Sequence, residues 1–268
     1  MIEKQSNRKF TGISMASPFT LKGKTLIVTG ASSGIGRQCA ISCALLGATV
    51  AVFGRDPERL NETLRSLEEP GKHIVCTVDL LEYDKVGEIV REVVRQKGRI
   101  DGLINCAGIS TTLPLNSIST QKMAQFMQTN VIASVNITRH TVKSANFSQE
   151  GGSVIFIGSV MGVAGENGKT LYSMTKGALV AAVKSMAIEL APRKIRVNAI
   201  SPGVVESPMS RSAVYSKDEE SLNRIKSLHP LGLGRVDDVA NACVFLLSDA
   251  SRWITGTNLI LDGGYLAK

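Results

Sequence analysis

Residues 26–36 read LIVTGASSGIG, an apolar run that passes directly into a glycine-rich turn. The run Leu26–Val28 is typical of a buried strand, and the residues from Ile35 onward are typical of a helix. Glycines at 30, 34 and 36 let the backbone approach a ligand closely, and the free N–H groups at a helix N-terminus attract a pyrophosphate. The stretch therefore predicts a strand–turn–helix unit that binds the phosphates of a dinucleotide.

The rest of the chain repeats this alternation of strand and helix. Strands are expected at 25–29, 49–53, 73–78, 100–105, 153–158, 195–200 and 257–261, and amphipathic helices near 35–46, 57–68, 82–97, 120–145, 172–191 and 237–248. Several strands are almost wholly apolar, as strands covered on both faces are. The pattern predicts an α/β fold with one Rossmann-like, doubly wound parallel sheet of about seven strands and helices on both faces.

This single domain is expected to span residues 22–268, after a flexible basic leader at 1–21. The first 24 residues carry five lysines and arginines against one glutamate, which is typical of a solvated tail. Within the domain, the polar segment 207–230 interrupts the alternation of strand and helix. We interpret this segment as a substrate lid, with a pair of ordinary surface helices as the alternative.

Composition argues against several other classes of protein. Half of the net charge of +8 lies in the first 24 residues, so no folded basic face for nucleic acid is expected. The five cysteines are odd in number and mostly lie in apolar segments, while the three histidines are scattered, so no metal site is expected. No apolar run reaches the roughly 18 residues of a membrane span, and the leader lacks the apolar core of a secretion signal. A cytoplasmic protein without membrane contact is the expectation.

Four further motifs follow the glycine-rich turn. They are Asn105-Cys106-Ala107-Gly108 after the fourth strand, Asn130 in the next helix, Ser159 after the fifth strand, and Tyr172-x-x-x-Lys176 thirteen residues later. From about residue 22 to the C-terminus, the sequence resembles the short-chain dehydrogenase/reductase family. The resemblance implies an NAD(P)-dependent oxidoreductase that moves a hydride between nicotinamide and a carbonyl or secondary alcohol, with Asn130, Ser159, Tyr172 and Lys176 as its catalytic tetrad.

The residue types themselves suit this chemistry. Tyr172 and Lys176 are four residues apart, so they share one face of a helix. A nearby ammonium favours phenolate and lowers the pKa of a tyrosine, which makes the phenol a usable proton donor. Ser159, at the carboxyl edge of the sheet, is placed to hydrogen-bond the same substrate oxygen. By resemblance, Asn130 holds a water that links Lys176 to solvent.

The choice of cofactor depends on the end of the second strand. Enzymes that prefer NAD commonly place an acid there for the ribose 2′-hydroxyl, but this sequence has Gly54 followed by Arg55. Arginine can pair with a 2′-phosphate, so NADP(H) is favoured and NAD(H) remains possible. Asp56 is a rival for the acid role, but its place before Pro57 is more typical of a helix N-cap.

The residues expected to bind the dinucleotide follow from the turn and the resemblance. They are Gly30, Ser32, Ser33, Gly34, Ile35, Gly36, Arg55, Asp79, Leu80, Asn105, Ala107, Gly108, Tyr172, Lys176, Pro202, Gly203, Val205 and Ser207. For Asp79, an adenine contact and a turn cap are both open. The Pro202–Ser207 segment resembles the one that runs beside the nicotinamide in this family.

The substrate is less well defined by the sequence. The chain most resembles 3-oxoacyl-[acyl-carrier-protein] reductases, but sugar, polyol and steroid dehydrogenases share the same motifs. A small-molecule or acyl-carrier-bound carbonyl is therefore expected. A basic position that some reductases use toward the acidic carrier is Asn136 here, although Arg193 is a second candidate contact. The C-terminal segment 253–265 resembles one through which many members pack as homotetramers. A non-catalytic dinucleotide-binding regulator is the alternative, but it predicts a damaged tetrad.

Overall fold

One parallel sheet organises the protein, for which the computed structural model describes residues 17–211 and 218–267. Its seven strands run in the order β3-β2-β1-β4-β5-β6-β9. They are β1 (Thr25–Thr29), β2 (Thr49–Gly54), β3 (Ile74–Thr77), β4 (Gly102–Asn105), β5 (Gly152–Ile157), β6 (Ile195–Pro202) and β9 (Asn258–Leu261). The expected doubly wound sheet is confirmed, because the chain order reverses direction between β1 and β4.

The helices connect these strands. They are α1 (Gly34–Leu45), α2 (Pro57–Arg65), α3 (Tyr83–Lys97), α4 (Thr120–Phe126), α5 (Ala133–Thr141), α6 (Thr170–Leu190), α7 (Pro208–Arg211), α8 (Glu219–Ser227) and α9 (Val236–Leu247). The helix expected over 120–145 consists of α4, a π-helical turn at Met127–Ile132, and α5. Such π-helical turns insert a residue into a helix and are frequent at functional sites.

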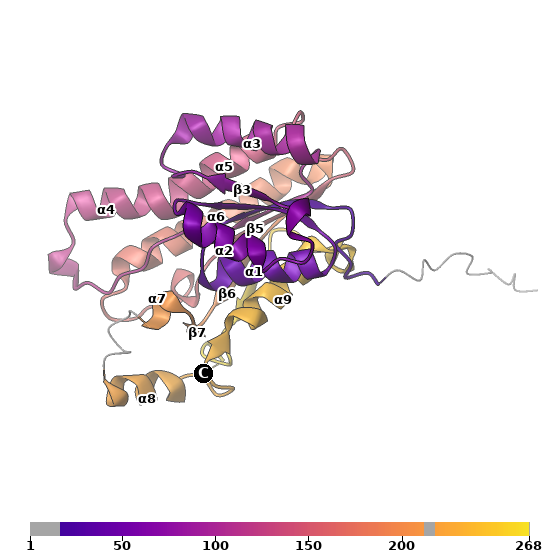
Figure 1. The fold of residues 1–268 in the computed structure, drawn as a ribbon. Coiled ribbons are helices and arrows are strands. Elements are labelled where there is room, and N and C mark those ends of the chain that lie inside the picture. The colour runs from indigo at the N-terminus through magenta and orange to yellow at the C-terminus, as the bar shows by residue number, and fades with distance from the viewer. Residues whose placement is uncertain (1–16, 212–217, 268) are drawn as a thin grey trace, which may run out of the picture.

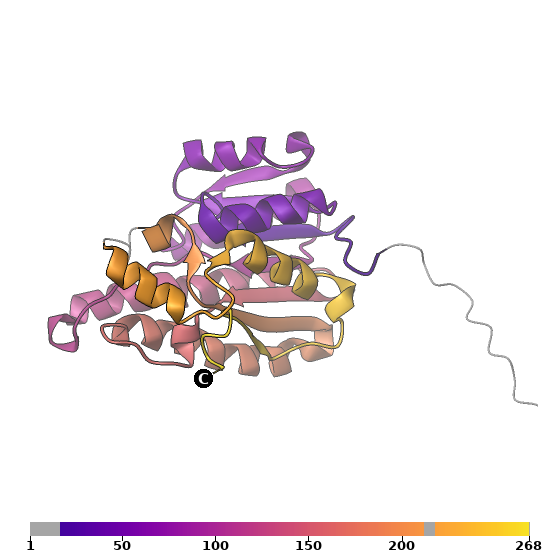
Figure 2. The same cartoon turned by 90° about the horizontal axis from the view of Figure 1, so that it is seen from below.

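Both faces of the sheet are covered, as the apolar strands predict. In β1, Leu26 and Val28 pack into a core shared with α1 and α9, while Ile27 faces the opposite core. That second core contains apolar side chains of α3, α5 and α6. Figures 1 and 2 show the two helical layers on either side of the sheet. Alternate residues of one strand thus stabilise both layers.

The folded domain begins earlier than residue 22. Leu21 is fully buried and donates its backbone N–H to the carbonyl of Leu46. The carbonyl of Pro18 accepts a hydrogen bond from the N–H of Ala250, and the ring of Phe19 packs against Phe245. The leader boundary at residue 21 is therefore corrected, because residues 17–21 pack against the body of the domain; residues 1–16 lie outside the described residues.

Elements that the sequence pattern did not predict lie at the carboxyl edge of the sheet. Strands β7 (Val205–Glu206) and β8 (Gly234–Arg235) form a small separate pair, and Figure 2 shows α7 and α8 on the side where the main strands end. Residues 212–217 of the expected lid lie outside the described residues. Among residues 17–211 and 218–267, no helix is long and apolar enough to cross a bilayer, and no group of three or more potential metal ligands occurs.

Candidate active site

A cleft of about 450 Å³ lies at the carboxyl edge of the sheet, where parallel strands deliver their following turns to one place. Most of the expected site residues line it. They are Gly30, Ser32, Ser33, Gly34, Ile35, Gly36, Arg55, Asp79, Leu80, Ala107, Gly108, Ser159, Tyr172, Lys176, Pro202, Gly203, Val205 and Ser207. Asn105 and Asn130 do not line the cleft.

The glycine-rich turn has the shape that a dinucleotide requires. Gly30 has φ 66°, and a Cβ there would lie 3.0 Å from the backbone of Ala107. A Cβ on Gly36 would lie 2.3 Å from the carbonyl oxygen of Gly30, so only glycine lets α1 start this close to β1. The turn therefore exposes backbone and the α1 N-terminus to the cleft, which fits a pyrophosphate.

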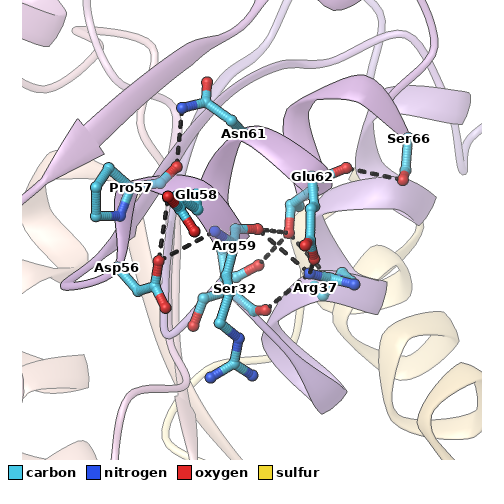
Figure 3. Close-up of polar contacts among 11 residues, drawn as sticks. Ser32, Arg37, Asp56, Pro57, Glu58, Arg59, Asn61, Glu62 and Ser66 are labelled. Carbon is cyan, nitrogen blue, oxygen red and sulfur yellow. Dashed lines mark hydrogen bonds and ion pairs between the residues drawn. The ribbon is translucent and has the colours of Figure 1, made fainter.

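Arg37, which the sequence reasoning missed, fixes this turn from behind. Its guanidinium donates to the carbonyl of Ser32 at 3.0 Å and to the hydroxyl of Thr63 at 3.0 Å, and it pairs with Glu62 at 2.9 Å (Figure 3). The Thr63 hydroxyl in turn donates to the carbonyl of Ala31 at 2.9 Å. These bonds join the turn to α2, so the phosphate-binding backbone is held in place before a ligand arrives.

Tyr172 and Lys176 lie as the helical spacing predicts. The Nζ atom of Lys176 lies 5.6 Å from the ring centroid of Tyr172 and donates to the carbonyl of Ile157 at 2.7 Å. Burial lowers the pKa of Lys176 to about 8. Ser159 accepts the N–H of Met161 at 3.2 Å, and its hydroxyl retains its proton for donation. A cation, a phenol and a hydroxyl thus line the same cleft.

The side chain of Asn130 is held between the turn after β4 and α6. Its Oδ1 accepts the N–H of Ile109 at 2.8 Å, while its Nδ2 donates to the Ile109 carbonyl at 2.9 Å and to the Thr175 hydroxyl at 3.0 Å. Only 1% of the residue is exposed. Both amide hydrogens are therefore occupied. The side chain positions the turn after β4 against α6, and the water relay that the resemblance implies stays a prediction.

The expected cofactor contact of Asn105 is also corrected. Asn105 is buried, and its Nδ2 donates to the hydroxyl of Thr138 at 3.0 Å, within the layer between the sheet and α5. Because side chains alternate along a strand, the last residue of β4 points into the core while the next residues reach the cleft.

Charged residues gather where β2 and β3 end. Arg55 lies 4.0 Å from Asp79, and Asp79 also accepts the N–H of Leu81 at 3.0 Å, so Asp79 both caps a turn and lines the cleft. Asp56 caps α2 by accepting the N–H groups of Glu58 and Arg59, which confirms the N-cap interpretation (Figure 3). Arg59 also lines the cleft and is a second cation that the sequence reasoning missed; its place in the first turn after Arg55 was the available signal.

His229 is another cleft residue that the sequence reasoning missed. Its Nε2 accepts the N–H of Val204 at 3.1 Å, and its Nδ1 lies 2.8 Å from the carbonyl of Ile225. These contacts define a neutral imidazole with the proton on Nδ1. The ring also packs 5.1 Å from that of Tyr265. His229 thereby joins α8 to the segment that follows β6, a link that no local sequence signal reveals.

Comparisons with known proteins agree with this geometry. A family model described as Enoyl-(Acyl carrier protein) reductase matches residues 30–266. The 3-oxoacyl-[acyl-carrier-protein] reductase FabG of Thermotoga maritima is 35% identical over 246 residues, which cover 91% of this chain and 98% of the relative. The L-xylulose reductase of Mus musculus is 34% identical over 250 residues, covering 92% and 98% of the two chains. The solved gluconate 5-dehydrogenase from Burkholderia cenocepacia, in complex with NADP and tartrate, has a TM-score of 0.87 at 27% identity and covers 94% of this chain and 98% of that one.

The fold is a parallel sheet with a glycine-rich turn that fits a pyrophosphate, and one cleft contains a tyrosine, a lysine and a serine. These features together define an NAD(P)-dependent oxidoreductase. The chain belongs to the short-chain dehydrogenase/reductase family. Its cofactor is accordingly a nicotinamide dinucleotide, and the residues around the glycine-rich turn fit that group.

Proposed function

We propose that the protein is an NADP(H)-dependent enzyme that interconverts a carbonyl compound and the corresponding secondary alcohol. The observation that carries the proposal is the placement of Tyr172, Lys176 and Ser159 on the wall of a cleft that begins at the glycine-rich turn. In the reducing direction, one carbonyl, one hydride and one proton give one alcohol.

Tyr172, Lys176 and Ser159 each have a defined task. The bound nicotinamide supplies the hydride to the carbonyl carbon. Ser159 donates its hydroxyl proton in a hydrogen bond to the carbonyl oxygen and so orients the substrate. Tyr172 transfers its phenolic proton to the same oxygen, while the ammonium of Lys176 stabilises the phenolate left behind. In the oxidising direction the phenolate accepts that proton back.

Two substrate classes follow from different observations. A 3-oxoacyl thioester on an acyl carrier is supported by the similarity to the 3-oxoacyl-[acyl-carrier-protein] reductases. A polar carbonyl of the sugar and polyol type is supported by similar identity to sugar-converting relatives and by Ser110, Glu166 and Lys169 in the cleft. The carrier contact loses support from Asn136, which is buried and donates to the carbonyl of Tyr83.

A direct assay tests the proposed function. Purified protein is mixed with NADPH or NADH and with 3-oxoacyl thioesters, ketoses or simple ketones, and nicotinamide absorbance is followed. Turnover of one class with kcat/KM at least tenfold above the others would assign the substrate. A protein that binds the dinucleotide but turns over none of these carbonyls, nor the matching alcohols with the oxidised cofactors, would instead be the regulator.

The preference for NADP(H) belongs to this proposal. Arg55 and Arg59 both line the end of the cleft where β2 terminates. The strand ends in Gly54, so it lacks the acid that would bind a ribose 2′-hydroxyl. Two guanidinium groups favour a 2′-phosphate over a free hydroxyl.

Arg55→Ala should weaken binding of NADPH by about 1–3 kcal/mol, the range of a charge-assisted hydrogen bond, and leave NADH nearly unchanged. Fluorescence titration of both cofactors measures the two changes. Arg65→Ala, at the far end of α2, is the control and should affect neither. Equal losses for both cofactors would show that Arg55 does not read the phosphate.

We also propose that the segment 207–230 is a substrate lid. Met209, Ile225 and His229 line the cleft from this segment, and closure over the substrate would exclude water from the hydride path. Amides of 218–230 should exchange with solvent quickly in the free protein and slow markedly with cofactor and a substrate analogue. Mass spectrometry of deuterium uptake measures this, and equal uptake in both states would identify α8 as a fixed surface helix.

Assembly and location complete the proposal. A homotetramer is supported by exposed apolar side chains on Ile132, Val135, Met174, Ile188 and Trp253, the last 92% exposed. Light scattering that gives the mass of a single chain would contradict it.

A cytoplasmic location fits five cysteines that are all free, since reducing compartments keep thiols unpaired.

A further inference from the structure

A cation lies on the substrate side of the cleft, outside the catalytic tetrad. Lys169 precedes the first residue of α6 and lies three residues before Tyr172, so it stands about one helical turn from the proton donor. It is half-buried and lines the cleft. Its Nζ donates to the hydroxyl of Thr112 at 2.7 Å, which joins the loop after β5 to the loop after β4.

The charge of Lys169 is not paired within the described protein. Among residues 17–211 and 218–267, no carboxylate lies within 4.0 Å of its Nζ. Glu166 is near enough to raise the pKa of Lys169, but burial outweighs this and the pKa lies below its ordinary value. A partly desolvated ammonium without an ion pair gains free energy when an anion binds beside it.

The other described cations of the cleft are already accounted for. Arg55 and Arg59 lie at the end of β2 and α2, beside the adenosine part of the expected cofactor site. Lys176 donates to the carbonyl of Ile157 beneath Tyr172. Among the cations that line the cleft in the described part of the chain, Lys169 is thus the one left without an assigned role.

We propose that Lys169 binds an anionic substituent of the substrate, a carboxylate or phosphate group, close to the reacting carbonyl. The inference rests on the proposed function and names its substrate class: an oxo acid or oxo phosphate and the corresponding hydroxy compound. A 3-oxoacyl thioester carries no charge near its carbonyl, so the inference also separates the two substrate classes.

Matched pairs of substrates test this. Acetoacetate, levulinate and 5-oxohexanoate place a carboxylate at increasing distance from the ketone, and the methyl ester of each removes the charge. With NADPH, wild-type kcat/KM for at least one acid should exceed that of its ester about tenfold or more. Lys169→Gln should lower kcat/KM for that acid about 10- to 100-fold and change its ester less than about twofold. Lys169→Arg should keep most of the preference.

Two control variants separate charge from structure. Thr112→Val removes the bond between the two loops but keeps the ammonium, so the preference for the acid should persist. Lys184→Gln removes an exposed lysine of α6 that does not line the cleft and should change nothing. Equal losses for acid and ester in Lys169→Gln, or loss of the preference in Thr112→Val, would overturn the inference.

A binding measurement distinguishes failure of the inference from failure of the proposed function. Glutarate, which cannot be reduced, should bind the wild-type protein in isothermal titration, and at least tenfold more weakly in Lys169→Gln. If glutarate binds in this way but no carbonyl is turned over, the proposed anion site is supported and the proposed oxidoreductase function is contradicted. If the esters are turned over but Lys169→Gln does not change the binding of glutarate, the proposed anion site is contradicted and the proposed function is supported.

Discussion

Tyr172→Phe should lower kcat by about 10²–10⁴-fold or more, the range of general acid catalysis. The substitution keeps the ring that packs beside Lys176 and removes only the hydroxyl that we propose as the proton donor. Binding of NADPH should stay within about twofold of wild type, because the glycine-rich turn and Arg55 are untouched. Steady-state kinetics and cofactor titration on the same preparation measure the two effects.

The matched control for this variant is Tyr83→Phe. Tyr83 begins α3 and does not line the cleft, so removal of its hydroxyl should leave kcat unchanged. Near-normal turnover in Tyr172→Phe would remove Tyr172 from the role of proton donor, and another group in the cleft would have to supply the proton.

Lys176→Met should abolish turnover to a similar extent and at the same time stabilise the protein without cofactor at pH 7. Burial lowers the pKa of Lys176 from 10.5 to about 8, which corresponds to a cost of about 3 kcal/mol for the charged form. Loss of the hydrogen bond from the ammonium to the carbonyl of Ile157 costs about 1.5–3 kcal/mol, the range for a charged donor. The free energy of unfolding should therefore rise by up to about 1.5 kcal/mol, as measured by urea denaturation.

The pH dependence of this gain has a defined sign. Below pH 8 the lysine is charged in both the folded and the unfolded states, so the full cost of burial is present. Between pH 8 and 10.5 the folded state releases its proton first, and the cost disappears. The stability difference between Lys176→Met and wild type should shrink across that window. Lys184→Met, on the exposed side of α6, should show neither effect; a less stable Lys176→Met protein would mean that the hydrogen bond outweighs burial.

Much of the fold follows from local patterns in the sequence. Leu26, Ile27 and Val28 are apolar in succession because β1 is buried on both faces, and such runs mark strands of this kind wherever they occur. The pair Tyr172 and Lys176 was predictable because a helix fixes the relation between residues four apart. Asp56 before Pro57 identified the start of α2 for the same reason: capping depends on a few adjacent residues.

Other roles depended on contacts between segments that are distant in sequence. Asn130 binds the backbone of Ile109, and His229 joins Ile225 to Val204; in each case the choice of partner depends on how loops meet at the sheet edge. Motif spacing could place Asn130 near Tyr172 and Lys176, but it could not show that both of its amide hydrogens are occupied. The start of the folded domain before residue 22 likewise depends on contacts with Leu46 and Ala250.

The sequence by itself thus determined the parallel sheet, the phosphate-binding turn and the Tyr172–Lys176 pair, because periodicity, glycine placement and helical spacing act over a few residues. The tertiary structure alone decided which charges meet in the cleft. It brought Arg37 beside Glu62 and Thr63, Arg55 beside Asp79, and Lys169 beside Thr112 without a paired acid. A parallel sheet gathers the ends of all its strands at one edge, and the neighbours that result have no fixed separation along the chain.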